Sequence, residues 1–373
     1  MKTSKKTILV APLDWGLGHA TRCVPLIHAL LNHQFRVVLA ADGRAFNFLA
    51  KEFPDLSIIR LEGYKVHYPA KRSFFLNMFL STLPFYQSIR KEHKAIQVIA
   101  SEHHIDAIIS DNRYGLWSKN ITSVFLGHQM FIKVPGIFKW AEGLMHRLNQ
   151  YFIRHFDEHW IPDYQGKYNL SGDLSHKKTL PEKAHFIGPL SRFFLPDDTT
   201  NEAHTKKYDG HLLVILSGPE PQRTILETKL LHQLKKSSQK TIVVRGLTEK
   251  TGNYMLTPDV KVLQHAATTE LNRLILGSEL VICRPGYSSI MDLSATGKRA
   301  VFIPTPGQTE QEYLAKYFFN NKVFYYEDQK SFNLERALEK STEFEGFQLR
   351  YNPSLLEERI NKLQELINNQ ASF

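Results

Sequence analysis

Short apolar runs alternate with longer polar or amphipathic stretches along the first half of the chain. Five of these runs have the length and composition of buried strands, and they occupy residues 7–12, 36–41, 58–61, 106–110 and 123–126. Helical patterns lie between them, at residues 25–31 and 45–52. Strands that alternate with helices usually form a parallel sheet covered by helices. The pattern therefore predicts an α/β fold.

A second series of the same kind begins after a polar, turn-rich stretch at residues 189–207. Its strands are expected at residues 212–216, 241–244, 260–263, 280–283 and 301–304. We therefore predict two Rossmann-like domains, at residues 1–190 and 208–352. Residues 353–373 are predicted as a C-terminal helix, because five apolar residues are assigned to one helical face: Leu355, Leu356, Ile360, Leu363 and Ile367.

The composition is that of a soluble or peripheral protein. Of 373 residues, 42% are hydrophobic, and no apolar run reaches the roughly 20 residues needed to span a bilayer. The first apolar run is too short for a secretion signal. Cys23 and Cys283 both lie inside apolar runs, which fits a reducing cytoplasm. The net charge of +10 suits nucleic acid, an anionic membrane surface or a phosphorylated ligand.

The region from Ser278 to Ala315 carries the clearest chemical pattern. A strand is followed by a turn containing Gly286, and Ser288 and Ser289 open the next helix. Unpaired N–H groups at such a helix start form a site for an anion, most often a phosphate. A polar cluster follows the next strand and comprises Gln308, Glu310 and Gln311. Open α/β folds bind ligands at this sheet edge, so we predict a nucleotide site here.

Asp292 allows two interpretations. Its carboxylate lies one turn into the predicted helix, where it can accept both hydroxyls of a ribose. The spacing from Ser289 to Asp292 also fits a capping box, in which the carboxylate satisfies backbone donors. The neighbouring residues favour the ribose interpretation.

The first predicted strand leads into Gly16, Gly18 and His19. Two glycines before a helix allow the backbone to approach a ligand closely. An imidazole at the carboxyl end of a strand can titrate near neutral pH and remove a proton from a hydroxyl. A surface or helix-capping histidine is the alternative. The phosphate-type loop in the second half favours catalysis, so His19 is the predicted general base.

The second domain begins with a similar turn. Ser217 and Gly218 follow the strand at 212–216, and they can hold a diphosphate through backbone and hydroxyl donors. Arg223 or Arg245 would add positive charge. A plain strand-to-helix turn is the alternative interpretation.

An apolar block between Phe74 and Tyr86 is flanked by basic residues within the segment 64–94. It is too short to span a bilayer, and its pattern is typical of a segment that lies against anionic lipid. A buried helix with a solvated, charged end is an equal alternative. The sequence has no cysteine–histidine spacing typical of zinc and no nucleophile–base motif, so neither a metal nor a cofactor is predicted.

Together these motifs resemble the MurG-type glycosyltransferases of family 28 over nearly the whole chain. Gly16-Leu17-Gly18-His19 lies where the family has its first glycine-rich loop and histidine, and Ser217-Gly218 lies at its second glycine loop. Cys283-Arg284-x-Gly286, followed by Asp292, matches the family's C-R-S-G motif and ribose-binding acidic residue, which is Asp here rather than Glu.

Two further segments carry the resemblance. Gln308 to Gln311 lies at the polar pair that contacts the donor sugar in the family. Ile187 to Arg192 resembles the interdomain segment that ends in an arginine near the diphosphate. The resemblance therefore implies that Arg192 contributes to donor binding.

The resemblance implies a GT-B fold, with two Rossmann-like domains facing a central cleft and a C-terminal helix that can cross back to the first. It implies an inverting, metal-independent enzyme that moves a sugar from a nucleotide-sugar, such as UDP-GlcNAc, to a hydroxyl deprotonated by His19. The acceptor is unidentified, and a lipid-linked acceptor is one candidate. The expected location is the cytoplasm, with the inner face of the cell membrane as an additional candidate.

Two alternatives remain. The sequence Gly-x-Gly-His-x-x-Arg-Cys, from Gly16 to Cys23, also resembles a related nucleotide-sugar hydrolase of nonulosonate synthesis, in which the same histidine activates water. A basic, non-catalytic nucleic-acid binder would need basic and aromatic residues on one face. Only the segment 64–94 offers them, with too many aliphatic residues, so we expect no nucleic-acid partner.

Overall fold

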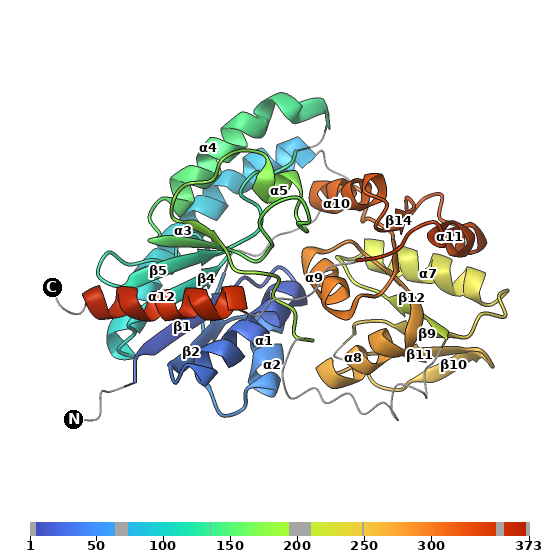
Figure 1. The fold of residues 1–373 in the computed structure, drawn as a ribbon, viewed down its shortest axis with the longest axis horizontal. Coiled ribbons are helices and arrows are strands. Elements are labelled where there is room, and N and C mark those ends of the chain that lie inside the picture. Colours follow the sequence, from blue (N-terminus) through green and yellow to red (C-terminus); the bar gives the residue numbers. More distant parts are fainter. Residues whose placement is uncertain are drawn as a thin grey trace. The chain divides into compact units, whose positions relative to one another are not determined.

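The computed structural model describes residues 5–63, 74–134, 136–193, 210–247, 250–347 and 354–370. They belong to two compact units (Figure 1). Unit 1 comprises Met1–Ile132, Trp140–Leu190 and Asn352–Phe373, and unit 2 comprises Lys133–Lys139 and Ser191–Tyr351. In both units, strands alternate with helices, so the α/β prediction is confirmed.

Unit 1 contains a seven-stranded parallel sheet with the order β3-β2-β1-β4-β5-β6-β7. Its strands are β1 (Thr7–Pro12), β2 (Arg36–Ala41), β3 (Ser57–Arg60), β4 (Ala107–Asp111), β5 (Thr122–Leu126), β6 (Glu158–Ile161) and β7 (Ala184–Phe186). β1, β4 and β5 are buried along their whole length, because every residue in them lies beneath helices. Such continuous apolar runs are typical of central parallel strands.

The α-helices of unit 1 are α1 (Leu17–Asn32), α2 (Gly43–Glu52), α3 (Phe74–Glu102), α4 (Glu142–Ile153), α5 (Asp173–His176) and α12 (Ser354–Gln370). A 3₁₀ helix, η1 (Gly136–Ala141), precedes α4. The C-terminal helix α12 belongs to unit 1 although the rest of the C-terminal half forms unit 2. Leu356, Ile360, Leu363 and Ile367 are buried, and Arg359 donates to Glu158 of β6 over 2.8 Å. The prediction that this helix crosses back to the first domain is confirmed.

Unit 2 contains a second seven-stranded sheet, with the order β10-β11-β9-β8-β12-β13-β14. Only β10 runs antiparallel to its neighbour. The strands are β8 (His211–Ile215), β9 (Thr241–Val244), β10 (Tyr254–Thr257), β11 (Val260–Leu263), β12 (Ser278–Cys283), β13 (Ala300–Phe302) and β14 (Tyr325–Tyr326). The helices are α7 (Gln222–Leu234), α8 (Thr268–Gly277), α9 (Tyr287–Thr296), α10 (Thr309–Asn320) and α11 (Leu334–Ser341).

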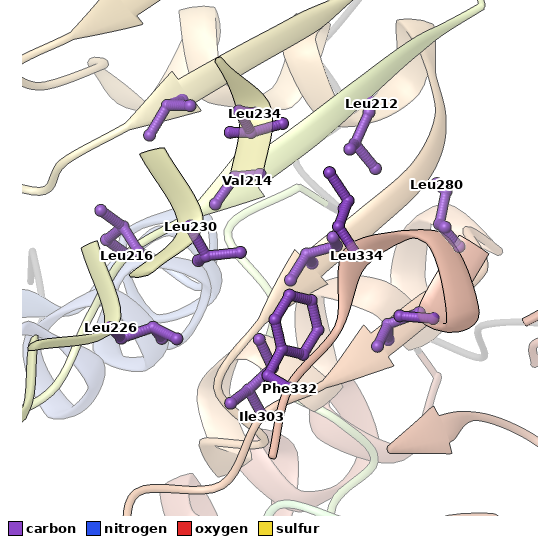
Figure 2. Close-up of a cluster of buried hydrophobic side chains, with 14 of the residues drawn as sticks. Leu212, Val214, Leu216, Leu226, Leu230, Leu234, Leu280, Ile303, Phe332 and Leu334 are labelled. Carbon is purple, nitrogen blue, oxygen red and sulfur yellow. The ribbon is translucent and has the colours of Figure 1, made fainter. Parts of the chain in front are cut away.

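One face of the second sheet packs against α7 and α11 (Figure 2). Leu212 and Val214 of β8 contribute to this core, as do Leu226 and Leu230 of α7 and Leu334 of α11. All five side chains are at least 98% buried. Burying a leucine or valine side chain contributes roughly 1.5–3 kcal/mol, so this cluster holds the strand ends of the sheet in place.

Both sheets have the doubly wound order in which the strand sequence reverses beside the first strand of the unit. In unit 1 the reversal lies between β1 and β4, and in unit 2 it lies between β8 and β12. At such a point the loops after the two strands lead to opposite faces, which leaves a crevice at the carboxyl ends. The predicted site residues follow these strands: His19 follows β1, Ser217 follows β8 and Gly286 follows β12.

Candidate functional site

His19 lies in the first turn of α1 and is hydrogen-bonded to a carboxylate of the neighbouring strand. α1 begins after Gly16, whose φ of 130° is a conformation that favours glycine. The Nδ1 atom of His19 lies 3.0 Å from Oδ1 of Asp111, the last residue of β4. Asp111 is fully buried, whereas the His19 side chain is 17% exposed. The Asp111 contact at Nδ1 leaves Nε2 as the ring nitrogen available to a substrate.

Arg22 holds the same carboxylate from the next turn of α1. Its Nε donates to Oδ2 of Asp111 over 2.8 Å, and its Nη2 also pairs with Asp111. Burial raises the pKa of Asp111, but the charges of Arg22 and His19 outweigh it and hold the pKa well below its usual range. Asp111 is therefore a carboxylate at neutral pH, although it lies in the core.

Asp111 and Arg22 were not predicted as site residues. The predicted strand ends at Ser110, one residue short of Asp111, and only the pairing of β4 with β1 brings Asp111 to His19. Arg22 lies three residues after His19, and this spacing places both side chains on one helix face. This spacing is the sequence signal that could have identified Arg22.

The first turn of α9 is open in the way that an anion site requires. Gly286 is its N-cap residue, no side chain caps the helix, and no acidic residue lies in the first turn. The predicted residues Ser288 and Ser289 lie in this turn and are partly exposed. The N–H groups of this turn and the positive end of the helix dipole favour a negatively charged ligand.

Gly218 lies in the loop after β8, which neighbours β12 in the sheet. Its φ is 104°, and a Cβ atom at this position would lie 3.4 Å from Oγ1 of Thr305 and 4.0 Å from Nε of Arg284. The Arg284 guanidinium is buried and donates to the carbonyl groups of Ile303 and Pro304 over 2.8 and 2.9 Å. Arg284 therefore ties together the loops that carry Gly218, Gly286 and the start of α10.

The capping-box interpretation of Asp292 is wrong. α9 begins at Tyr287 without a side-chain cap, so Asp292 lies beyond the first turn. Its Oδ1 accepts a 2.7 Å hydrogen bond from Oγ of Ser191. Burial raises the pKa of Asp292 to about 6, against the opposing effects of Arg192 and the Ser191 hydrogen bond. A carboxylate that a fold buries at this cost is a candidate ligand-binding group.

Arg192 lies in unit 2 beside this carboxylate. Its Nη1 lies 3.4 Å from Oγ1 of Thr268, and its guanidinium carbon lies 5.2 Å from the ring centre of Phe193. The charge of Arg192 lowers the pKa of Asp292. Arg192 and Asp292 are thus brought together, as the donor-site prediction requires.

Arg223 and Arg245 share one acidic partner. Arg223 donates to Glu227 over 2.8 Å and to Glu220 over 2.7 Å, and Arg245 also pairs with Glu227. Glu227 is buried, so these ion pairs are part of the packing of α7. Both arginines remain candidates for diphosphate binding, with much of their charge already balanced.

The polar cluster of α10 is partly used for structure. Gln308 is the N-cap residue and Glu310 lies in the first turn. Gln311 is 9% exposed, and its Oε1 accepts from the backbone N–H of Thr305 over 2.9 Å. Gln311 therefore fixes the loop after β13, while Gln308 and Glu310 lie at the open start of the helix.

The described residues contain neither a metal-binding cluster nor a membrane-spanning helix. In that part of the chain, no group of three or more His, Cys, Asp or Glu side chains is placed to hold a metal ion. None of its helices is long and apolar enough to cross a membrane. Residues 64–73 and the side chains of residues 74–82, which form most of the predicted interfacial segment, lie outside the described residues.

Comparisons with known proteins agree with this arrangement. Residues 212–368 match the model of the glycosyltransferase family 28 C-terminal domain. Similar solved structures include the glycotransferase of kitacinnamycin, with 13% identity, 99% of this chain and 96% of that chain covered, and a TM-score of 0.60. The glycosyltransferase SnogD from Streptomyces nogalater is 14% identical, and the match covers 99% of this chain and 96% of SnogD with a TM-score of 0.57. MurG from Acinetobacter baumannii is 13% identical, and the match covers 99% of this chain and 100% of MurG with a TM-score of 0.52.

No curated protein that was compared matches the sequence. The structural matches establish the fold, which is GT-B with two Rossmann-like domains, as predicted. The protein is a glycosyltransferase that uses a nucleotide-sugar. Residues 212–368 carry the match to family 28, and the predicted resemblance to the MurG-like enzymes is confirmed.

Proposed function

We propose that the protein transfers a sugar from a UDP-sugar, such as UDP-GlcNAc, to a hydroxyl group with inversion at the anomeric carbon. The observation that supports this most directly is the hydrogen bond between His19 and Asp111 at the β1–β4 reversal. Asp111 orients the imidazole, and Nε2 accepts the acceptor's hydroxyl proton. The acceptor oxygen then bonds to the anomeric carbon while the bond from this carbon to the diphosphate breaks. One direct displacement inverts the carbon.

Unit 2 would bind the donor. Asp292 accepts the ribose hydroxyls, and the first turn of α9, with Gly218, Ser217 and Arg192, binds the diphosphate. The departing diphosphate gains negative charge, and the N–H groups of α9 stabilise it without a metal ion. UDP is proposed as the nucleotide because the sequence motifs resemble those of MurG-type enzymes.

The test measures UDP release from UDP-GlcNAc with and without candidate acceptors, and determines the anomeric configuration of the product by NMR. Replacing His19 by Ala should lower turnover by about 10²–10⁴-fold, the range for a lost general base. UDP affinity should stay unchanged, because unit 2 binds the nucleotide. The control is His232→Ala, which removes an exposed histidine from α7.

Each alternative outcome has a distinct meaning. UDP release with free sugar and no dependence on an acceptor would show the hydrolase instead. Retention of configuration, or full activity in His19→Ala, would contradict the proposed mechanism. Addition of EDTA should leave the rate unchanged, since no metal takes part in the proposed step.

We further propose that the acceptor is lipid-linked and that the enzyme works at an anionic membrane surface on the inner face of the cell membrane. The support is an exposed apolar stripe that begins at Trp140, near the end of η1, and continues along α4, which is labelled in Figure 1. Its members are Trp140, Leu144, Leu148 and Tyr151, which are 75%, 56%, 43% and 49% exposed. Residues at these spacings share one face of a helix.

The charged residues around this stripe favour anionic lipid over other binding partners. Arg147 and Arg154 are exposed on α4 and at its end. The one acidic residue of α4, Glu142, is partly buried and paired with Lys177. Exposed apolar side chains bordered by cations, without exposed acids, are typical of helices that lie in a membrane interface.

A sedimentation assay with vesicles of phosphatidylglycerol and phosphatidylcholine tests the membrane proposal. Binding should fall as salt rises, because ions screen the arginines. The triple change Leu144→Ser, Leu148→Ser and Tyr151→Ser should abolish binding, whereas Ile225→Ser, at a 49% exposed site in unit 2, should not. If the unmodified protein ignores these vesicles at low salt, the membrane proposal is wrong and a soluble acceptor is favoured.

A further inference from the structure

Arg22 contacts two histidines, His19 and His128, in addition to the carboxylate of Asp111. The side chain is 2% exposed, and Asp111 is fully buried. Besides its two contacts with Asp111, its Nη1 lies 3.2 Å from Nδ1 of His128, in the loop after β5. Its Nη2 lies 3.0 Å from Nδ1 of His19. One guanidinium thus connects α1, β4 and the loop after β5.

The donor and acceptor capacities of these groups determine where the protons are. A guanidinium only donates, so Nδ1 of His128 accepts from Arg22 and carries no proton. Asp111 is ionised and only accepts. His19 can therefore donate to Asp111 if its proton is on Nδ1. In the competing arrangement, Nδ1 of His19 accepts from Arg22 and the proton is on Nε2, where it would block proton removal.

Electrostatics favours the first arrangement. The two N–H groups that Arg22 directs at Asp111 compensate the cost of burying the carboxylate. The remaining titratable group beside the carboxylate is Cys23, whose Sγ lies 3.6 Å from Oδ2 of Asp111 and whose pKa is raised by burial, so it stays neutral. A buried carboxylate is a stronger acceptor for the Nδ1 proton than water is.

We propose that Arg22 is a positioning residue that fixes the tautomer of His19. It holds Asp111 in place, so that His19 keeps its proton on Nδ1 and presents a free Nε2, and His128 fixes the guanidinium. Arg22 does not contact the reacting atoms in this scheme. The catalytic consequence rests on the proposed function, whereas the tautomer does not.

The direct test is ¹⁵N NMR of the full-length protein labelled at histidine, without substrate and above the pH at which His19 is protonated. The unmodified protein should show His19 with its proton on Nδ1. Arg22→Gln should shift this resonance toward a mixture of tautomers, and Arg22→Lys should restore part of the original signal. The tautomer is observed whether or not the chain transfers a sugar.

Kinetics provides the second measurement. Arg22→Gln should lower kcat by about 10- to 1,000-fold, less than or equal to the loss expected when a histidine takes the wrong tautomer. The pH profile of kcat/KM should shift as well, while KM for UDP-GlcNAc changes little. A merely structural role would lower the melting temperature without moving the pH profile or the tautomer.

Arg359→Gln is the matched control, because Arg359 is also a mostly buried arginine of unit 1 that donates to a buried carboxylate, Glu158. It should reduce stability without changing the His19 resonance. The proposal is overturned if the unmodified protein carries the His19 proton on Nε2. It is also overturned if folded Arg22→Gln and Arg22→Lys both leave the tautomer and the pH profile unchanged.

Discussion

At the scale of single residues, Asp292 of the proposed donor site shows how burying a charged group lowers stability. Its ordinary pKa is 3.8 and burial raises it to about 6. Between these values the folded protein binds a proton more tightly than the unfolded chain, so stability falls as pH rises through this window. At pH 7 the Asp292 carboxylate is ionised, so the full cost of burying its charge lowers the free energy of unfolding. Arg192 and Ser191 offset only part of this cost.

Asp292→Asn should therefore separate stability from binding. The amide keeps an oxygen for the Ser191 hydroxyl and removes the buried charge, so the free energy of unfolding at pH 7 should rise by roughly 1–3 kcal/mol. Affinity for UDP should fall strongly, because the ribose hydroxyls lose a charged acceptor. Urea unfolding and calorimetry measure the two effects, with Asp328→Asn as a control at an exposed site in unit 2. Unchanged UDP affinity would remove Asp292 from the donor site.

The pH dependence of donor binding follows from the same carboxylate. As pH falls below about 6, Asp292 takes up a proton, and affinity for UDP-GlcNAc should drop by up to about tenfold per pH unit. UDP-GlcNAc suits this titration because its diphosphate is esterified at both ends and does not titrate in this range. Calorimetry from pH 7.5 to 5 measures the slope, and Asp292→Asn should flatten it. An equal slope in both proteins would assign the titration to another group.

At the scale of elements, the turns after β8 and β12 depend on backbone conformation as much as on side chains. Gly218→Ala places a Cβ at a φ of 104° and against Thr305. Gly210→Ala introduces similar strain before β8, where φ is 77° and no atom lies within 4 Å of the added Cβ. The two substitutions should each destabilise the protein by roughly 1–2 kcal/mol. Only Gly218→Ala should weaken UDP binding in calorimetry, and equal effects on affinity would contradict a diphosphate loop at Gly218.

The sequence predicted the elements of the sheet centres better than those at the edges. β1, β2, β9 and β11 match their predicted residues, because their residues are mostly apolar and buried, with Arg36 and Lys261 as the exposed exceptions. The short strands β6, β7, β10 and β14 were not predicted. The residues of β7, β10 and β14 are exposed or partly exposed, so their pattern does not differ from that of loops. β6 is buried, but it is short and begins with the polar residues Glu158 and His159. α1 begins at Leu17 rather than near residue 25, since Gly16 can cap a helix without a polar side chain.

At the scale of the whole molecule, α12 belongs to unit 1 while the preceding domain forms unit 2. The family model for the C-terminal domain reaches residue 368, so the helix is part of that sequence domain but of the other structural unit. Leu363 is fully buried on this helix. Its contribution to stability should therefore appear in unit 1.

Leu363→Ala should lower the free energy of unfolding of unit 1 by about 2–5 kcal/mol, the cost of removing a buried leucine side chain. UDP affinity should remain unchanged, because the proposed donor residues lie in unit 2. Urea unfolding followed by tryptophan fluorescence tests the first expectation, since all four tryptophans precede residue 161. The neighbouring exposed change Lys362→Ala should cost less than 1 kcal/mol. Equal stability of both variants would contradict the packing of α12.

The sequence by itself determined the two α/β domains, the strand ends that carry glycine turns, and His19 as the candidate base. These features depend on local periodicity and on residue types that follow directly along the chain. The tertiary structure alone decided that Asp111, 92 residues away, contacts His19, that Asp292 accepts from Ser191, 101 residues away, and that α12 packs on unit 1. The order of strands in a sheet sets such contacts, and local sequence patterns do not encode that order.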